Sequence, residues 1–172
     1  MAEFIKAYQK MILHEGIYSN DPDDPGLRTV MGISEKTWPN WEGWKIVNTL
    51  SSEKEMTTNS ELQNKVQLFY LINFWNPIKG ANIINQEIAE SLFDFSVNTG
   101  LNTAISIAQA IIGVKNDGIV GAMTISALNA CNAELFLAKF TIAKILRYVN
   151  IVKKRPVSKK YFYGWVCRAI GV

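Results

Sequence analysis

Hydrophobic residues recur with helical spacing along most of this chain. Residues 2–15 carry an apolar stripe spaced i, i+1, i+4, i+7 and i+8, formed by Phe4, Ile5, Tyr8, Met11 and Ile12. Comparable patterns predict helices at about residues 61–75, 84–98, 102–112, 122–130, 133–152 and 158–170. The pattern therefore predicts a mainly α fold with about seven helices.

A different pattern follows the first predicted helix, which ends at Gly16. Residues 18–32 contain closely spaced Pro and Gly turn signals beside a short β-compatible stretch, Thr29–Met31. We interpret this segment as a loop with one small β-hairpin. The expected fold class is therefore α+β, with helices dominating.

Local signals mark the boundaries of several other elements. Ser52 and Glu55 form a candidate capping box, and Asn132 is a candidate N-cap. Asn76–Pro77 is expected to end the helix that begins near residue 61. Residues 34–38 are predicted to form a short helical turn.

Composition narrows the class of protein. The chain has 172 residues, of which 48% are hydrophobic and 19% charged, which is typical of a globular protein and excludes disordered and collagen-like chains. One His and two Cys are too few for a Cys/His zinc site, and the rest of the sequence implies no metal and no organic cofactor. We interpret Cys131 and Cys167 as small buried residues, and the sequence leaves a disulfide between them open.

The net charge of +3 conceals an uneven distribution. Residues 1–134 carry nine Lys or Arg against all 15 Asp or Glu, whereas residues 135–172 carry nine Lys or Arg and no acid. An acidic body with a basic end suggests contact with a polyanion, for which nucleic acid, anionic lipid and bacterial wall polymers all qualify.

The N-terminus and the apolar runs bear on location. Glu3, Lys6 and Lys10 interrupt the first apolar residues, so we expect no signal peptide. No apolar run approaches the roughly 18 residues of a membrane span. We therefore expect synthesis in the cytoplasm, no membrane span, and a separate route of release for any action outside it.

The densest candidate chemistry begins at Glu15. A carboxylate at the last turn of a helix lies at the negative end of the helix dipole, and three nearby aspartates add like charge, so we expect its pKa to be raised. A carboxylic acid that stays protonated near neutral pH is the general acid that glycosidic cleavage needs. The alternative is a solvated residue at a helix end.

A partner for this acid is sought on the following loop. Asp21, Asp24 and Thr29 follow Glu15 by 6, 9 and 14 residues, on a segment able to fold back over a cleft. A second carboxylate or a polar group there would hold the attacking water or stabilise developing positive charge. Both aspartates are alternatively turn residues that bond to their own backbone.

The segment HEGIYSNDPDDPGLRTVMGIS resembles the signature of the glycoside hydrolase family 108 muramidases, also called secretion activator proteins. The family pattern is approximately E-G-G-Y-x-N-D-P-x-D-P-G-G-x-T-x-x-G-I-T. Ile17 and Leu27 stand where the pattern has glycine, which changes the backbone freedom at both positions. Matches without a gap are found at Glu15, Gly16, Tyr18, Asn20, Asp21, Pro22, Asp24, Pro25, Gly26, Thr29, Gly32 and Ile33.

The resemblance extends through the second half of the chain. Residues 92–100, 108–114 and 117–124, with the closing Gly164-Trp165-Val166-Cys167-Arg168, are similar to the predicted peptidoglycan-binding region of these proteins. The implied domains are a lysozyme-like hydrolase region at 1–82 and a peptidoglycan-binding helical region at 83–172, packed as one unit. Asp94, set between two phenylalanines, is either a substrate contact or a buried polar anchor.

The resemblance implies a lysozyme-like N-acetylmuramidase that cleaves peptidoglycan glycan strands, in wall lysis or protein secretion, after export or holin-like release. Glu15 would protonate the leaving oxygen, Asp24 (or Asp21, which is less favoured) would assist the water, and Thr29 would orient it. Candidate substrate contacts are Tyr18, Asn20, Asp21 and Asp94, with candidate sugar-stacking rings at Trp38, Trp41, Trp44, Tyr18 and Tyr70.

Two alternatives remain open at this stage. A peptidoglycan-binding protein that has kept the fold without turnover is suggested by the departures at Ile17 and Leu27. A nucleic-acid-binding helical protein is suggested by the basic end, although the acidic body argues against it and we do not expect nucleic acid as a partner.

Overall fold

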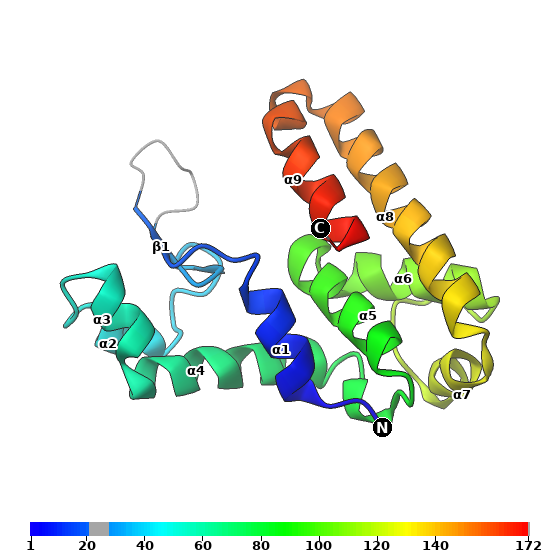
Figure 1. The fold of residues 1–172 in the computed structure, drawn as a ribbon, viewed down its shortest axis with the longest axis horizontal. Helices are drawn as coiled ribbons and strands as arrows, with labels where there is room; N and C mark the ends of the chain where they lie inside the picture. The colour runs from blue at the N-terminus through cyan, green and yellow to red at the C-terminus, as the bar shows by residue number, and fades with distance from the viewer. Residues whose placement is uncertain (21–27, 172) are drawn as a thin grey trace. The chain divides into compact units, whose positions relative to one another are not determined.

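The computed structural model describes residues 1–20 and 28–171. The chain folds into two compact units. We call Tyr8–Asn73 the sheet unit, and Met1–Ala7 together with Phe74–Val172 the helical unit. Helix α1 (Phe4–Ile12) runs from the helical unit into the sheet unit (Figure 1).

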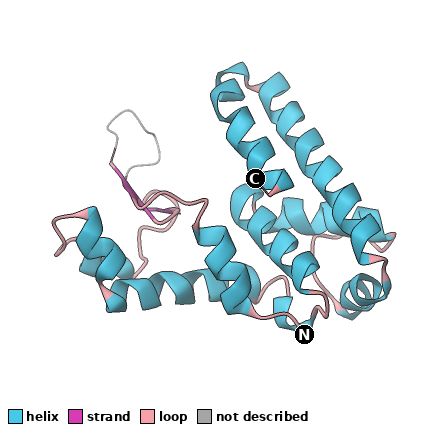
Figure 2. Cartoon of the chain, in the orientation of Figure 1, coloured by secondary structure: helices cyan, strands magenta, loops and turns pink. Residues whose placement is uncertain are grey.

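The sheet unit contains the only β-structure among the described residues (Figure 2). Three two-residue strands form an antiparallel sheet in the order β1-β2-β3, and three helices and a π-helical turn follow. The core lies between this sheet and α4, where the side chains of Val30, Ile33, Leu62 and Val66 are fully buried. The elements are β1 (Tyr18–Ser19), β2 (Thr29–Val30), β3 (Ile33–Ser34), α2 (Gly43–Val47), α3 (Glu53–Thr58), α4 (Ser60–Tyr70) and the π-helix η1 (Leu71–Trp75), whose last two residues belong to the helical unit.

Side-chain caps set where α3 and α4 begin. The Glu55 backbone N–H donates to Ser52 Oγ at 3.2 Å, and the Glu55 carboxylate accepts from the Ser51 N–H at 2.7 Å. This confirms the predicted capping box, with the reciprocal bond falling one residue earlier than in the standard pattern. Asn59 caps α4 by accepting from the Leu62 N–H at 2.8 Å.

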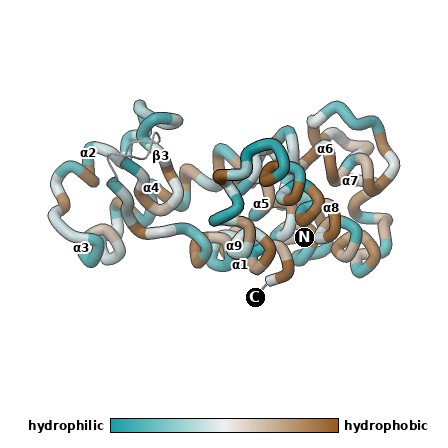
Figure 3. The backbone as a smooth tube through the Cα atoms, turned by 90° about the horizontal axis from the view of Figure 1, so that it is seen from above, coloured by the Kyte–Doolittle hydropathy of each residue, from teal (hydrophilic) through white to brown (hydrophobic). Residues whose placement is uncertain are grey.

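The helical unit is built from five longer helices. The aromatic rings of Phe95 and Phe140 are fully buried and meet edge to face with centroids 5.4 Å apart, which joins α5 to α8. Figure 3 shows hydrophobic and hydrophilic residues alternating along these helices, as expected for helices with one face in a core. The elements are the 3₁₀ turn η2 (Gly80–Asn82), α5 (Gln86–Thr99), α6 (Leu101–Ile112), α7 (Ala122–Ala130), α8 (Ala133–Lys154), the 3₁₀ turn η3 (Pro156–Ser158) and α9 (Lys159–Ile170).

The expected mainly α class with a small antiparallel sheet is confirmed, but the element count was low. The described residues form nine α-helices, whereas about seven were predicted. The sequence pattern missed α2 and α3 because they are only five and six residues long, too short to show a periodic pattern. The hairpin also has a third strand, β3. Residues 34–38, predicted as a helical turn, hold the end of β3 and a single turn closed by the Trp38 N–H on the Ser34 carbonyl at 2.9 Å.

Helices α8 and α9 run antiparallel and reverse direction at η3 (Figure 1). An aromatic column ties them together, since the Trp165 ring lies 5.3 Å from that of Tyr148 and 5.9 Å from that of Tyr161. Tyr148 is buried and Tyr161 is 52% exposed, so the column leads from the core to the surface.

The cysteines and the helix lengths give two further results. Cys131 and Cys167 are free thiols and only half-buried, so the interpretation of both as buried residues was wrong. Within the described ranges, no helix has both the length and the apolar character needed to cross a bilayer.

Candidate active site

The end of α1 positions Glu15. Ala7 and Met11 on α1 are buried, which fixes the helix against the core. Beyond Ile12 the chain continues in a turn, with the Glu15 N–H donating to the Ile12 carbonyl at 3.2 Å. Glu15 therefore lies one turn past the helix, with a half-buried side chain, near the carbonyl end of the helix.

The sheet supplies the surface that faces this turn. Tyr18 pairs with Val30 and Ser19 with Thr29, and β2 continues into β3 through Met31 and Gly32 alone. Met31 and Gly32 have φ angles of 45° and 79°, as a tight two-residue hairpin requires.

Hydrogen bonds fix this hairpin turn in place. The Met31 N–H donates to the Ile17 carbonyl at 2.9 Å, and the Met31 carbonyl accepts from the Tyr70 hydroxyl at 2.7 Å. The turn is thus anchored both to the segment after Glu15 and to α4. These bonds hold Met31 in a left-handed conformation that residues other than glycine rarely adopt.

Glu15, Gly32 and Tyr70 converge at one point. A Cβ atom placed on Gly32 would lie 2.7 Å from Glu15 Oε2 and closer still to the Tyr70 hydroxyl oxygen. The Glu15 carboxylate therefore lies directly against the bare backbone of the turn. Sequence reasoning treated Tyr70 as a stacking ring and did not find this contact, because Tyr70 lies 39 residues from Met31.

Thr29 belongs to a row of hydroxyl groups. In the register of the sheet, Thr29 lies opposite Ser19 on β1 and opposite Ser34 on β3. Opposite residues in an antiparallel sheet share a face, so the three hydroxyl side chains lie on the face away from the buried Val30. Ser19 and Ser34 were not among the predicted site residues, although strict alternation along the strands is the signal that identifies them.

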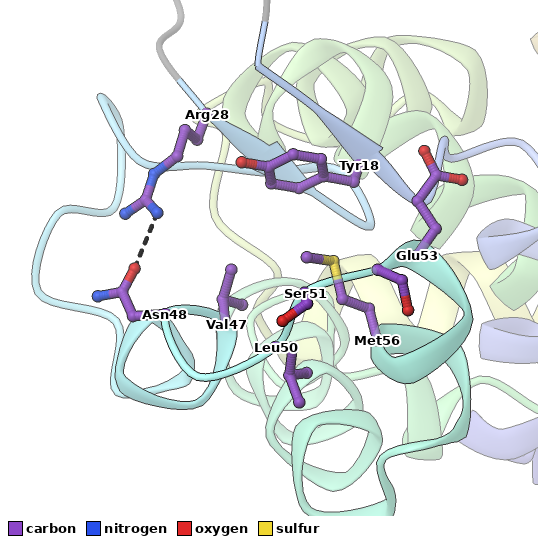
Figure 4. Close-up of a pocket in the computed structure, with 9 residues that line it drawn as sticks. Tyr18, Arg28, Val47, Asn48, Leu50, Ser51, Glu53 and Met56 are labelled. Atoms are coloured by element: carbon purple, nitrogen blue, oxygen red, sulfur yellow. Dashed lines mark hydrogen bonds between the residues drawn. The ribbon is translucent and has the colours of Figure 1, made fainter.

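A pocket of about 360 Å³ opens beside the sheet in the same unit. Figure 4 shows the Tyr18 ring along one side of it, with its hydroxyl turned toward Arg28, and Val47 and Met56 on the opposite side. Ser51, Ser52 and Glu53 complete the lining together with Asn48 and Leu50. An aromatic face beside hydroxyl, amide and carboxylate groups is chemistry that suits a polar, ring-shaped ligand such as a sugar.

Arg28 lines this pocket and is held in place by several hydrogen bonds. Its guanidinium donates twice to the Glu35 carboxylate, at 2.7 and 2.9 Å, and once to the Asn48 amide oxygen at 2.8 Å (Figure 4). It also lies over the Trp44 ring, 5.4 Å from the ring centroid. The hydrogen bonds lower the pKa of Glu35 and raise that of Arg28, so the pair stays ionised and its geometry stays fixed.

The predicted stacking rings divide into core and surface residues. Trp44 and Tyr70 are 5% and 1% exposed, so these two candidate rings belong to the core and cannot stack on a ligand. Trp38 and Trp41 are half-buried and line a second cavity of about 340 Å³ together with Phe69.

Three of the predicted loop residues lie in the segment that the structure does not describe, and two lie beside it. Asp21, Asp24 and Leu27 lie outside the described residues. Asn20, the last residue before that gap, is exposed. Ile17 is 38% exposed and its carbonyl takes part in holding the turn at Met31.

Asp94 lies on α5, in the helical unit. Its carboxylate pairs with Arg168 of α9, with nitrogen–oxygen distances of 2.8, 3.0 and 3.2 Å, and both side chains are at least four-fifths buried. Lys144 of α8 lies nearby and donates to Ser91 Oγ at 2.7 Å. Asp94 is thus built into a polar cluster that joins three helices.

Gln109 organises the turn at Asp117-Gly118. Its amide nitrogen lies 2.9, 3.0 and 3.2 Å from Asp117 Oδ1, the Ile119 carbonyl and Thr124 Oγ1. Its amide oxygen accepts from the N–H groups of Asp117 and Gly118 at 3.1 and 2.9 Å. The motif at residues 108–124 therefore builds a loop around one buried glutamine.

Metal chemistry has no candidate centre in residues 1–20 and 28–171, where no group of three His, Cys, Asp or Glu side chains lies close enough to hold an ion. The candidate site consists instead of an acid, a row of hydroxyls and a rigid turn.

Comparisons with known proteins match both halves of the chain. The family described as Glycosyl hydrolase 108 matches residues 8–100, and the family described as Predicted Peptidoglycan domain matches residues 103–170. The solved structure of Brucella abortus SagA is 27% identical, with a TM-score of 0.72, over 96% of this chain and 88% of that one. No curated protein matches the sequence significantly.

Proposed function

The chain belongs to the Glycosyl hydrolase 108 family, and from this premise we propose that it is an N-acetylmuramidase. The family and the second match make it a glycoside hydrolase of the peptidoglycan-hydrolase type. The bond we assign is the β-1,4 link between N-acetylmuramic acid and N-acetylglucosamine. The observation that carries the assignment is the half-buried Glu15 carboxylate held against the Gly32 turn.

In the proposed reaction, Glu15 protonates the leaving glycosidic oxygen. Its carboxylate is half-buried and lies against the Gly32 turn, where it would meet the oxygen of a bound glycan. The Thr29 hydroxyl orients water, and Asp24, with Asp21 as the alternative, stabilises developing positive charge. The pocket at Tyr18 and Arg28, whose lining includes neither Glu15 nor Thr29, is a further contact for the glycan strand away from the reacting bond.

The protein acts on the bacterial wall, in lysis or in protein secretion. The second family match, over residues 103–170, supports peptidoglycan as the polymer that it binds. Non-catalytic wall binding is the rival function that the experiment below must exclude.

The test compares the wild type with Glu15→Gln on purified, insoluble peptidoglycan. New reducing ends are reduced with borohydride and identified after acid hydrolysis, so that muramic acid and glucosamine ends are distinguished. We expect muramic acid ends from the wild type, and a rate about 10²–10⁴-fold lower from Glu15→Gln, because the general acid is lost. Glu61→Gln, an exposed glutamate of α4, is the matched control and should keep wild-type activity.

Three results would contradict the proposal. Equal release by the wild type and Glu15→Gln would remove the role of Glu15. Glucosamine ends would show that a different bond is cut. Binding of the wild type to peptidoglycan without any new ends would establish the non-catalytic alternative.

A further inference from the structure

The corner between α8 and α9 exposes an unusual run of residues. In the segment 153–161, which we call the basic tip, every residue except Ser158 is exposed. Five of the nine side chains are cationic, namely Lys153, Lys154, Arg155, Lys159 and Lys160.

Nothing acidic balances these charges locally. Residues 135–172 contain no Asp or Glu, and within the described part of the chain none of the five cations forms a salt bridge. Two further basic side chains of this region, Lys144 and Arg168, are largely buried and belong to the polar cluster around Asp94. The basic tip therefore presents concentrated positive charge to the solvent.

Apolar side chains stand among the charges. Val157, in the middle of the basic tip, is 71% exposed, and Tyr161 is 52% exposed. The Lys160 ammonium lies 4.9 Å from the Tyr161 ring centroid. The aromatic column through Trp165 connects this exposed ring to the buried ring of Tyr148.

The same mixture continues along the outer face of α8. Positions spaced four and three residues apart form one exposed stripe that ends in the basic tip at Lys153. The stripe combines 54–66% exposed apolar side chains with cations and has no acid. Its members are Leu135, Lys139, Ile142, Leu146, Asn150 and Lys153.

We propose that the basic tip and the outer stripe of α8 dock the protein onto an anionic phospholipid surface. Cations attract lipid phosphates, while exposed Val157, Tyr161 and the stripe's apolar residues enter the boundary between headgroups and acyl chains. A soluble polyanion would use the cations but leave the apolar residues exposed. A symmetric, tip-to-tip contact with a second copy of the chain is disfavoured because like charges would face each other.

The experiment is co-sedimentation of the full chain with vesicles. One set contains phosphatidylglycerol in phosphatidylethanolamine, and the other replaces phosphatidylglycerol with phosphatidylcholine. We expect the protein to partition onto the anionic vesicles only, and to be released as salt is raised. The same titration with soluble poly(glycerol phosphate) and with duplex DNA measures the response to polyanions without a bilayer.

Two pairs of variants separate charge from apolar contact. Lys159→Ala with Lys160→Ala should lower partitioning about 25-fold, at about fivefold per lysine, whereas Lys36→Ala with Lys54→Ala, which removes two exposed lysines of the sheet unit, should not. Val157→Ser should lower it severalfold, whereas Ile119→Ser, equally exposed at 71%, should not.

Several outcomes would overturn the proposal. These are equal partitioning onto both vesicle sets, or no partitioning onto either. Binding to poly(glycerol phosphate) or DNA that matches the anionic vesicles and ignores Val157→Ser would identify a soluble polyanion instead. Self-association that the tip variants abolish would identify a second copy. All variants should cleave soluble peptidoglycan fragments at the wild-type rate, so that failure here is distinct from failure of the proposed function.

Discussion

At the scale of single residues, Gly32 has little freedom to change. Its φ angle of 79° is strained for any other residue. The space that a Cβ would need is already occupied by the Glu15 carboxylate and the Tyr70 hydroxyl. Neither group can retreat cheaply, because one is the proposed acid and the other holds the Met31 carbonyl.

Gly32→Ala should therefore lose both stability and activity. We expect a loss of about 1–2 kcal/mol in the free energy of unfolding from the left-handed conformation. We expect a fall of about 100-fold in kcat from the displaced carboxylate. Urea unfolding and turnover on peptidoglycan fragments measure the two effects. Gly121→Ala is the control and should be nearly neutral. The φ angle of Gly121 is −99°, and the added Cβ atom would have no neighbouring atom within 4 Å.

Thr29 allows a test that depends on one hydroxyl group. If this group orients the water, Thr29→Ala should lower kcat at least tenfold with little change in KM, while Thr29→Ser should keep most of the activity. Thr29→Val is the third variant, since it preserves the β-branched shape in β2 without the hydroxyl. Full activity in the valine variant would exclude the proposed role.

At the scale of elements, one α6 side chain makes several hydrogen bonds to the loop at residues 117–119. Gln109 is 1% exposed and fills both its donor and acceptor capacity on this loop. Gln109 therefore has a packing role in this loop and offers no exposed group to a ligand.

Gln109→Leu should loosen the loop while leaving α6 in place. The N–H groups of Asp117 and Gly118 would lose their acceptor, which costs about 1 kcal/mol in the free energy of unfolding because water can partly replace it. Hydrogen exchange should accelerate at these two amides before it does in α6. Gln9→Leu, on an exposed position of α1, controls for the added apolar surface.

Elements with strong local signals were predictable from the sequence. The predicted N-cap is confirmed, with Asn132 accepting from the Leu135 N–H at 2.8 Å, and α7 has the predicted bounds. The short α2 gave no such signal. The bonds of Arg28 to Glu35 and of Tyr70 to Met31 also gave none, because they depend on how the chain folds back and not on spacing along it. The site geometry was therefore less predictable than the fold.

At the scale of the whole molecule, buried charge links stability to pH. Lys144 is 4% exposed and its ammonium lies over the rings of Phe95 and Phe140. Burial lowers its pKa from 10.5 to about 8, against an opposing effect of Asp94 and with a smaller contribution from Arg168. Burial also raises the pKa of Tyr148 to about 12.

These pKa values predict a stability maximum near pH 10. Between about pH 8 and 10 the unfolded chain binds more protons at Lys144 than the folded one, so the free energy of unfolding rises by up to about 1.4 kcal/mol per pH unit. Above pH 10 the folded chain retains the Tyr148 proton that the unfolded chain loses, so stability falls again.

Chemical unfolding from pH 7 to pH 11 measures this profile. Lys144→Met should remove the rise between pH 8 and 10, and Lys139→Met, at an exposed position of the same helix, should keep it. A rise that persists in Lys144→Met would show that another group causes it.

The ion pair between Asp94 and Arg168 limits where this chain can be recombined with the chain of a relative. One family match ends at residue 100 and the other begins at residue 103, so the pair joins two segments that appear separable by sequence. A chain cut at Gly100 would keep α5 but expose Phe95 and leave the Asp94 carboxylate without its guanidinium. Recombination at that junction would therefore yield a misfolded chimera unless α5, α8 and α9 are inherited together.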